Sequence, residues 1–462
     1  MVELNKYLLA SLKTFLDDFN YHLLMTMTLG ESVYFVNPIP GYDVVKVAVK
    51  KLPQMQQKII SFFALGEPVE YSFIEENLGN ELLCYMHELK LVNIDENDIW
   101  LNGYLLTSYA NCYFLVSNVY YYPTNQSAFQ KPYIGIDTYW LSRIITNKAD
   151  GSVLDLCTGS GIQAILAAKT AQRVVAVDID PISAFIAQLN ACLNSVDDRM
   201  TVLNGDLYSV LEEDDKFDYI FSNPPFIPIP HDVDFPISGD GGEDGLKIIH
   251  KIISGYHKYL LPGGEAIMIG QGVGNGENIS LANALPYLLS NFTTKIIVSG
   301  KTPIENQAYN FAELSNTLNV NNQANTDGKL WLSIYERLEI EYFYDFTFFA
   351  KNTNAMSNKH EVIHFFDSWG KIDTPVSKIG TIEKSSEQFI IHSLHGKRIL
   401  TVDEEAVAFL QSIDGNMTLE NLVEKLLQAY HSNYGNDSKR KLLGKYMFFC
   451  SMLERYGLME KY

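Results

Sequence analysis

The sequence predicts an α/β fold, a doubly wound parallel sheet over residues 150–350, with a smaller helical unit on each side. Strand-like apolar runs alternate with helical patterns through this region, as parallel sheets require. The run Val153–Leu156 also leads directly into Gly159 and Gly161, a turn typical of the first strand-to-helix connection in such sheets. The length of 462 residues exceeds one ordinary domain, so flanking units are expected.

Seven segments have the apolar and β-branched composition of buried strands. They are 152–156, 173–177, 200–203, 219–222, 264–270, 295–299 and 339–349. Helical patterns fall between most of them. We therefore expect a seven-stranded, Rossmann-like sheet within a middle domain of residues 111–355, which begins with an aromatic-rich connector over 111–150.

The N-terminal domain, residues 1–110, has a winged-helix-like pattern. Helices are expected at 54–65, 70–77 and 80–90, and the alternating segment 91–106 resembles a small hairpin. Winged helices often bind DNA, but residues 51–106 carry three Lys against nine Asp and Glu. We therefore expect a packing or dimerisation module, which leaves a homodimer open.

The C-terminal domain, residues 356–462, is expected to be a small helical or winged-helix-like unit. Short strands are expected at 389–392 and 398–401. Helices are expected at 403–413, 418–430 and 439–455, the second of which has a plausible start at Thr418.

The overall composition limits the classes of partner. The net charge of −20 disfavours nucleic acid, because a protein that grips phosphates normally has a basic face. The five cysteines are scattered without metal-ligand spacing, so they are expected to be reduced thiols in a cytoplasmic protein, and no metal site is expected. No apolar stretch approaches the roughly 18 residues of a spanning helix, so no membrane partner is expected.

The glycine turn has the features of a nucleoside site. Gly159 and Gly161 allow a ligand to approach the backbone closely, and Asp155 precedes them at the end of the first strand. Asp178 ends the second strand, where a carboxylate can accept protons from both ribose hydroxyls. Asp206 follows the third strand, where it can accept from an adenine amino group. Three carboxylates at strand ends suit S-adenosylmethionine (SAM) better than a pyrophosphate cofactor, because the negative charge of a pyrophosphate would face these carboxylates. The expected cofactor-binding residues are Asp155, Cys157, Thr158, Gly159, Gly161, Asp178, Ile179, Asp206, Leu207 and Asn223.

A rigid polar corner, Asn223-Pro224-Pro225-Phe226, ends the fourth strand beside this turn. The Asn223 side-chain oxygen and the carbonyl after it can each accept an N–H from an amine or amide. The prolines fix φ and hold those acceptors in place, and Phe226 offers a flat face for stacking. We expect Asn223, Pro224 and Phe226 to carry catalysis; the alternative is a proline turn that merely ends a strand.

Further residues are expected around the acceptor. Asn223 and Phe226 are joined by Tyr133, Asp240 and Gln271 as candidate substrate-binding residues. Tyr133 precedes the donor turn, where it can cap the cofactor together with Asp137. Asp240 lies in a glycine-rich stretch, for which a solvated loop is the alternative interpretation.

At this point the chain resembles the class I SAM-dependent methyltransferases, through Asp155–Gly161 and Asp178. The corner resembles the (Asn/Asp/Ser)-Pro-Pro-(Tyr/Phe/Trp) signature of amino-group methyltransferases. With the glycine-rich stretch that follows, residues 150–275 resemble the release-factor glutamine methyltransferase (HemK-like) family. Phe226 stands where that family usually has a Tyr, and a Phe at this position is closer to the motif of the guanine-modifying RNA enzymes.

The resemblance implies in-line methyl transfer to nitrogen, in which catalysis comes mostly from positioning. The leading hypothesis is a SAM-dependent N-methyltransferase that acts on a peptide, a protein or an amino-acid-like small molecule. An RNA base-amine methyltransferase is favoured by Phe226 and opposed by the charge. A non-catalytic scaffold with a methyltransferase fold is the third possibility.

Overall fold

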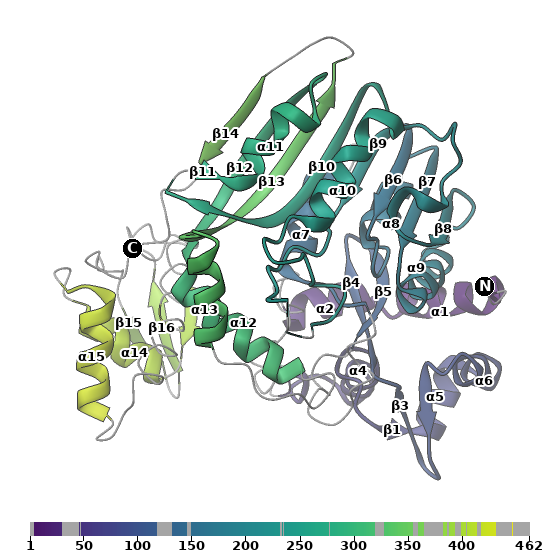
Figure 1. Cartoon of the computed structure of the whole chain (residues 1–462). Helices are drawn as coiled ribbons and strands as arrows, with labels where there is room; N and C mark the ends of the chain where they lie inside the picture. The colour runs from purple at the N-terminus through teal and green to yellow at the C-terminus, as the bar shows by residue number, and fades with distance from the viewer. Residues whose placement is uncertain are drawn as a thin grey trace.

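The protein is described by a computed structural model, in which a broad central sheet carries helices on both faces (Figure 1). The described residues are 4–29, 46, 48–117, 132–145, 149–231, 233, 235–276, 278–318, 328–353, 359–364, 382–385, 388–392, 399–402, 404–413, 417–430 and 446.

The central sheet has the strand order β14-β12-β13-β10-β9-β6-β7-β8, and β11 pairs with the end of β10. The order reverses between β6 and β9, because β7 and β8 extend to one side of β6 while β9 and β10 extend to the other. Ligands bind at such a reversal, beyond the carboxyl ends of the strands. The bounds are β6 (Ser152–Leu156), β7 (Arg173–Asp178), β8 (Met200–Asn204), β9 (Phe217–Ser222), β10 (Leu260–Asn275), β11 (Asn278–Ile279), β12 (Phe292–Pro303), β13 (Tyr342–Asn352) and β14 (His360–His364).

All seven expected strands are present, and the α/β class is confirmed. The expected number of seven strands is too low, because β11 and β14 also join the sheet. β14 runs parallel to β12 and lies beyond the expected boundary at residue 355. Its sequence, with a His at each end and partly exposed apolar residues between, lacks the apolar run that reveals a buried strand.

Two apolar cores cover the two faces of this sheet. Alternate strand residues point to opposite faces, so Val153 and Val174 lie in one core while Leu154 and Val175 lie in the other. The first core includes α7 (Ile136–Ile145), α8 (Ile162–Ala168) and α9 (Pro181–Leu193); the second includes α10 (Lys247–Tyr259) and α11 (Ser280–Leu288). Helices on both faces explain why the inner strands β6 and β7 are buried almost throughout.

The N-terminal segment contains the expected helices and a three-stranded antiparallel sheet of order β1-β3-β2. Its elements are α1 (Lys6–Asp18), α2 (Tyr21–Leu29), α4 (Gln54–Ile60), the π-helical turn η2 (Ser61–Leu65), β1 (Val69–Glu70), α5 (Tyr71–Leu78), α6 (Asn80–Glu88), β2 (Val92–Ile94) and β3 (Asp98–Leu101). The winged-helix interpretation of this unit stays a prediction.

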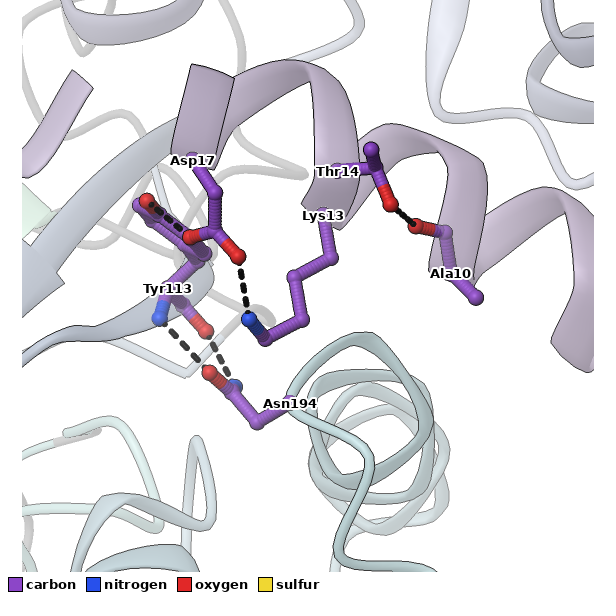
Figure 2. Close-up of polar contacts among 6 residues, drawn as sticks. All are labelled: Ala10, Lys13, Thr14, Asp17, Tyr113 and Asn194. Carbon is purple, nitrogen blue, oxygen red and sulfur yellow. Dashed lines mark hydrogen bonds and ion pairs between the residues drawn. The ribbon is translucent and has the colours of Figure 1, made fainter. Parts of the chain in front are cut away.

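A hairpin of β4 (Tyr104–Tyr109) and β5 (Cys112–Ser117) connects this segment to the central sheet. The Asn194 side chain, which follows α9, accepts from the backbone N–H of Tyr113 at 2.8 Å and donates to its carbonyl at 2.6 Å. The Tyr113 hydroxyl donates to Asp17 at the end of α1, and Lys13 pairs with the same carboxylate (Figure 2). The expected domain boundary at residue 110 lies in the turn of this hairpin, and the three-domain division stays a prediction.

Two helices are inserted between β12 and β13, and they lie beside the lower end of the sheet in Figure 1. They are α12 (Ile304–Leu318) and α13 (Gly328–Arg337). We call this pair the inserted helical hairpin. It packs on Ile227, Ile229, Val233 and Phe235 and forms a small apolar core with them that includes Phe311, Trp331 and Tyr335.

The C-terminal segment contains an antiparallel sheet of β15 (Ile382–Ser385), β16 (Gln388–His392) and β17 (Ile399–Val402). Two helices follow, α14 (Glu404–Ser412) and α15 (Leu419–Tyr430), at the expected positions. Thr418 starts α15 as expected, because its hydroxyl accepts from the Asn421 backbone N–H at 3.3 Å. The helix expected at 439–455 lies outside the described residues.

Within the described ranges, no helix has the length and apolar character needed to cross a membrane.

Candidate active site

The glycine turn after β6 has a backbone that only a few residue types adopt readily. Gly159 and Gly161 have φ values of 53° and 81°, and Cys157 also lies in the left-handed region at 59°. A Cβ on Gly161 would lie 3.1 Å from the Cβ of Ala187 in α9. Gly161 therefore lets the start of α8 pack closely against α9 while the turn faces the cavity.

Two carboxylates hold the turn, one fully buried and one partly buried. Asp155 is 1% exposed and accepts a hydrogen bond from the Thr158 hydroxyl at 2.5 Å. Asp178, at the end of β7, accepts from the backbone N–H groups of Gly159 at 2.7 Å and Asp180 at 3.0 Å. Asp178 therefore joins the glycine turn to the next strand end.

Burial makes both carboxylates harder to ionise in the free protein. It raises the pKa of Asp155 to about 7 and the pKa of Asp178 to about 6. Each also interacts with the negative charge of a neighbouring carboxylate, which raises its pKa further. A cation in this site would lower both pKa values, so the site favours a positively charged ligand.

A cavity of about 740 Å³ opens at the carboxyl ends of these strands. Its volume lies in the range of small-molecule sites. Most of the sequence-predicted residues line it: Tyr133, Cys157, Thr158, Gly159, Asp178, Ile179, Asp206, Leu207, Asn223, Pro224, Phe226 and Asp240. Asp155 and Gly161 are not among the lining residues. They support the turn from behind.

The charged residues of the lining are mostly acidic. Among the described residues it contains five Asp, at positions 137, 178, 180, 206 and 240, and two Lys, at positions 247 and 251. Lys251 lies 3.6 Å from the Asp206 carboxylate and partly neutralises it. The cavity therefore retains an excess of negative charge, which fits the sulfonium and ammonium groups of SAM and disfavours a pyrophosphate.

The side chain of Asn223 is held by two residues at the start of α7. Its amide nitrogen donates to the Asp137 carboxylate at 2.6 Å and to the Thr138 hydroxyl at 3.3 Å. Both partners use the N–H side of the carboxamide, so its oxygen is the atom that can accept an N–H from a substrate. Burial raises the pKa of Asp137. The sequence interpretation placed Asp137 over the cofactor and missed its contact with Asn223.

The glycine-rich stretch after the corner supports the corner's backbone. The N–H of Ile227 donates to the Gly239 carbonyl and its own carbonyl accepts from Gly241, each at 2.9 Å. A Cβ on Gly241 would lie 2.8 Å from the Phe226 backbone, and one on Gly245 would lie 2.5 Å from the Phe226 carbonyl oxygen. These glycines therefore allow the two segments to touch.

Asp240 has two roles in this stretch. It lines the cavity, and its carboxylate also accepts from the Gly242 backbone N–H at 2.9 Å. Contact between Asp240 and a substrate stays a prediction.

The described lining of the cavity does not include Gln271. Its amide nitrogen donates to Asp345 on β13 at 2.9 Å. Asp345 in turn acts electrostatically on Asp137 and helps to raise its pKa. Contact between Gln271 and a substrate stays a prediction.

Several lining residues were not singled out from the sequence, among them Asp180, Ser183, Lys247 and Lys251. Asp180 caps α9 through the N–H groups of Ile182 and Ser183. Its place two residues after Asp178 and directly before Pro181 is the signal of a helix start that could have identified it.

Comparisons with known proteins agree with this geometry. The model of the methyltransferase small domain family matches residues 123–292. The ribosomal protein uL3 glutamine methyltransferase of Bradyrhizobium diazoefficiens is 37% identical over 131 residues, which are 26% of this chain and 41% of the relative. The release factor glutamine methyltransferase of Clostridium acetobutylicum is 36% identical over 145 residues, which are 29% of this chain and 50% of the relative.

A third relative, from Methanocaldococcus jannaschii, carries the name of a protein N5-glutamine methyltransferase. It is 30% identical over 174 residues, which are 37% of this chain and 84% of the relative. The chain spans half or less of the first two relatives and most of the third. From the glycine turn, the acidic cavity and these matches together, we conclude that this chain belongs to the SAM-dependent methyltransferases of the protein N5-glutamine methyltransferase family.

Proposed function

We propose that this protein transfers a methyl group from SAM to an amide nitrogen of a protein or peptide. The observation that carries the proposal is the Asn223 carboxamide, whose N–H side is occupied by Asp137 and Thr138. Its oxygen then serves as a fixed acceptor for one substrate N–H. The relatives' names, which specify glutamine in ribosomal protein uL3 and in release factors, support an amide nitrogen as the acceptor.

The residues around the glycine turn fit the methyl donor. Asp178 at the end of β7 can accept from ribose hydroxyls, and the acidic lining favours a cation. Gly159 leaves room for the ligand, since a Cβ built on it meets nothing within 4 Å. When bound, SAM supplies an electrophilic methyl group on its sulfonium.

The chain's contribution to methyl transfer is position and orientation. The Asn223 oxygen and the Pro224 carbonyl each accept one N–H of a planar carboxamide, and Phe226 stacks against its plane. A nitrogen held by both N–H groups would present its lone pair to the donor methyl. As the N–C bond formed, the bond between the methyl group and the sulfonium sulfur would break, S-adenosylhomocysteine would leave, and the proton would pass to solvent. Asp137 is engaged with Asn223 at 2.6 Å, so its role in this proposal is to orient Asn223.

Asn223→Ala tests the proposal. We expect calorimetry to show SAM binding within about threefold of the wild type, because most donor contacts lie on β6 and β7. Methyl transfer from labelled SAM to extract proteins should fall by at least about a hundredfold. Undiminished transfer by the variant would refute the role of the corner. Failure of the wild type to bind SAM would instead favour a non-catalytic scaffold.

Phe226 favours a second candidate, an RNA base-amine methyltransferase, because a Phe at this position is closer to the guanine-modifying enzymes. The acidic lining and the net charge of −20 oppose it. RNA retention in a low-salt mobility assay, with methyl incorporation into that RNA, would support this candidate over a protein acceptor.

A further inference from the structure

The acceptor corner is part of a segment that makes few hydrogen bonds of its own. Residues 223–230 include prolines at 224, 225, 228 and 230. A proline has no backbone N–H, so half of this segment's residues have no donor. Its shape therefore depends on hydrogen bonds and packing from neighbouring segments.

One neighbour is the glycine-rich stretch. Ile227 and Ile229 donate to the carbonyls of Gly239 and Gly242, each at 2.9 Å. These bonds hold one edge of the segment and leave the Pro228 carbonyl, on a buried residue, to be satisfied from elsewhere.

The second neighbour is the inserted helical hairpin. The Tyr335 hydroxyl on α13 donates to the Pro228 carbonyl at 2.9 Å, and Tyr335 is 0% exposed. Trp331, one helical turn earlier, packs edge-on against Phe235 with ring centroids 6.4 Å apart. Arg337 also lies 3.7 Å from Glu243 in the glycine-rich stretch. The hairpin thus contacts both the corner segment and the stretch that supports it.

This support lies outside the part of the chain that the family model matches. The family model ends at residue 292, before α12 and α13 begin. The hairpin follows β12 and precedes β13, so it is anchored at both ends in the central sheet. A shift of α13 against the sheet would move Tyr335 and, with it, the Pro228 carbonyl.

We propose that Tyr335 is a positioning residue for methyl transfer, which fixes the acceptor corner through the Pro228 carbonyl. The proposal rests on the proposed function, since it assigns Tyr335 a part in orienting the acceptor. Without the hydroxyl, the buried carbonyl loses its donor and the segment relaxes towards other partners. The Asn223 oxygen and the Pro224 carbonyl then no longer hold a substrate nitrogen in line with the donor methyl.

The test compares Tyr335→Phe with Tyr21→Phe in the full chain. Tyr21 is a matched control, because it is also 0% exposed and donates to a main-chain carbonyl, that of Leu106, at 2.7 Å. Both variants keep the ring and lose one buried hydrogen bond. Hydrogen exchange measured by mass spectrometry then follows the amides of residues 223–245 against those of 152–168.

We expect Tyr335→Phe to speed exchange over 223–245 and leave 152–168 unchanged, whereas Tyr21→Phe leaves both unchanged. At saturating SAM, transfer of labelled methyl to proteins of an extract lacking the enzyme should fall about tenfold in Tyr335→Phe. SAM affinity by calorimetry should stay within twofold of the wild type, as it should in Tyr21→Phe.

Unchanged exchange over 223–245 in Tyr335→Phe, or an equal rise in both variants, would overturn the proposal. So would faster exchange with transfer at the wild-type rate. If the wild type itself transfers no methyl group, the proposed function fails, and the assignment of Tyr335 to methyl transfer fails with it. The exchange data then still measure whether α13 fixes the segment.

Discussion

The contact between Asp137 and Asn223 yields a prediction that can be worked from the structure. Asp137→Ala removes the carboxylate that accepts from the Asn223 amide at 2.6 Å and leaves only the 3.3 Å bond to Thr138. A hydrogen bond to a charged group contributes about 1.5–3 kcal/mol, which corresponds to roughly ten- to hundredfold in rate if it serves only to orient Asn223. We therefore expect kcat to fall by about that factor.

Asp137→Asn is the matched variant, because its carboxamide oxygen can still accept from Asn223. We expect its loss of kcat to be smaller than that of Asp137→Ala. The assay is steady-state transfer of labelled methyl to extract proteins, with SAM affinity measured by calorimetry. A rise in the SAM dissociation constant that accounts for the whole loss would refute the reasoning, because Asp137 would then act on the donor.

Three further predictions concern the donor turn and the corner. Burial raises the pKa of Asp178 to about 6, so the free site carries less negative charge below that pH. If bound SAM restores an ordinary pKa near 4 to this carboxyl, the affinity for SAM should rise about tenfold from pH 5 to pH 8. An affinity that calorimetry finds to be the same at both pH values would contradict this. Gly161→Ala forces a Cβ onto a residue with φ of 81° and close to Ala187, so thermal denaturation should show a loss of about 1–2 kcal/mol together with weaker SAM binding. Gly241→Ala places a Cβ 2.8 Å from the Phe226 backbone, so methyl transfer should fall while SAM binding persists. Equal losses of methyl transfer and SAM binding would count against an acceptor corner that acts separately from the donor site.

Short sequence motifs were enough to predict those parts of the site that follow neighbouring strands of the sheet. Leu156 and Ser222 are direct partners in the pairing of β6 with β9. The segments that follow them, the glycine turn and the Asn223 corner, must therefore start side by side. Strand periodicity and the position of two short motifs were sufficient for that inference, because parallel strands place their carboxyl ends at one edge.

Contacts between distant segments were not predictable in this way. Asn223 is 86 residues from Asp137, and Pro228 is 107 residues from Tyr335. Nothing local at Tyr335 distinguishes it from a buried core tyrosine. The glycine-rich stretch could be recognised as a loop, but its close approach to Phe226 depends on how two backbones pack. Such contacts follow from tertiary structure and carry no periodic or motif signal of their own.

The most direct test of the central claim is mass spectrometry of an extract treated with SAM that carries a deuterated methyl group. Extract from cells lacking the gene is incubated with the wild type or with Asn223→Ala. We predict one labelled methyl group on a side-chain amide nitrogen of a protein, present with the wild type and absent with the variant. Label on oxygen, carbon or RNA, or equal label with both proteins, would contradict the account.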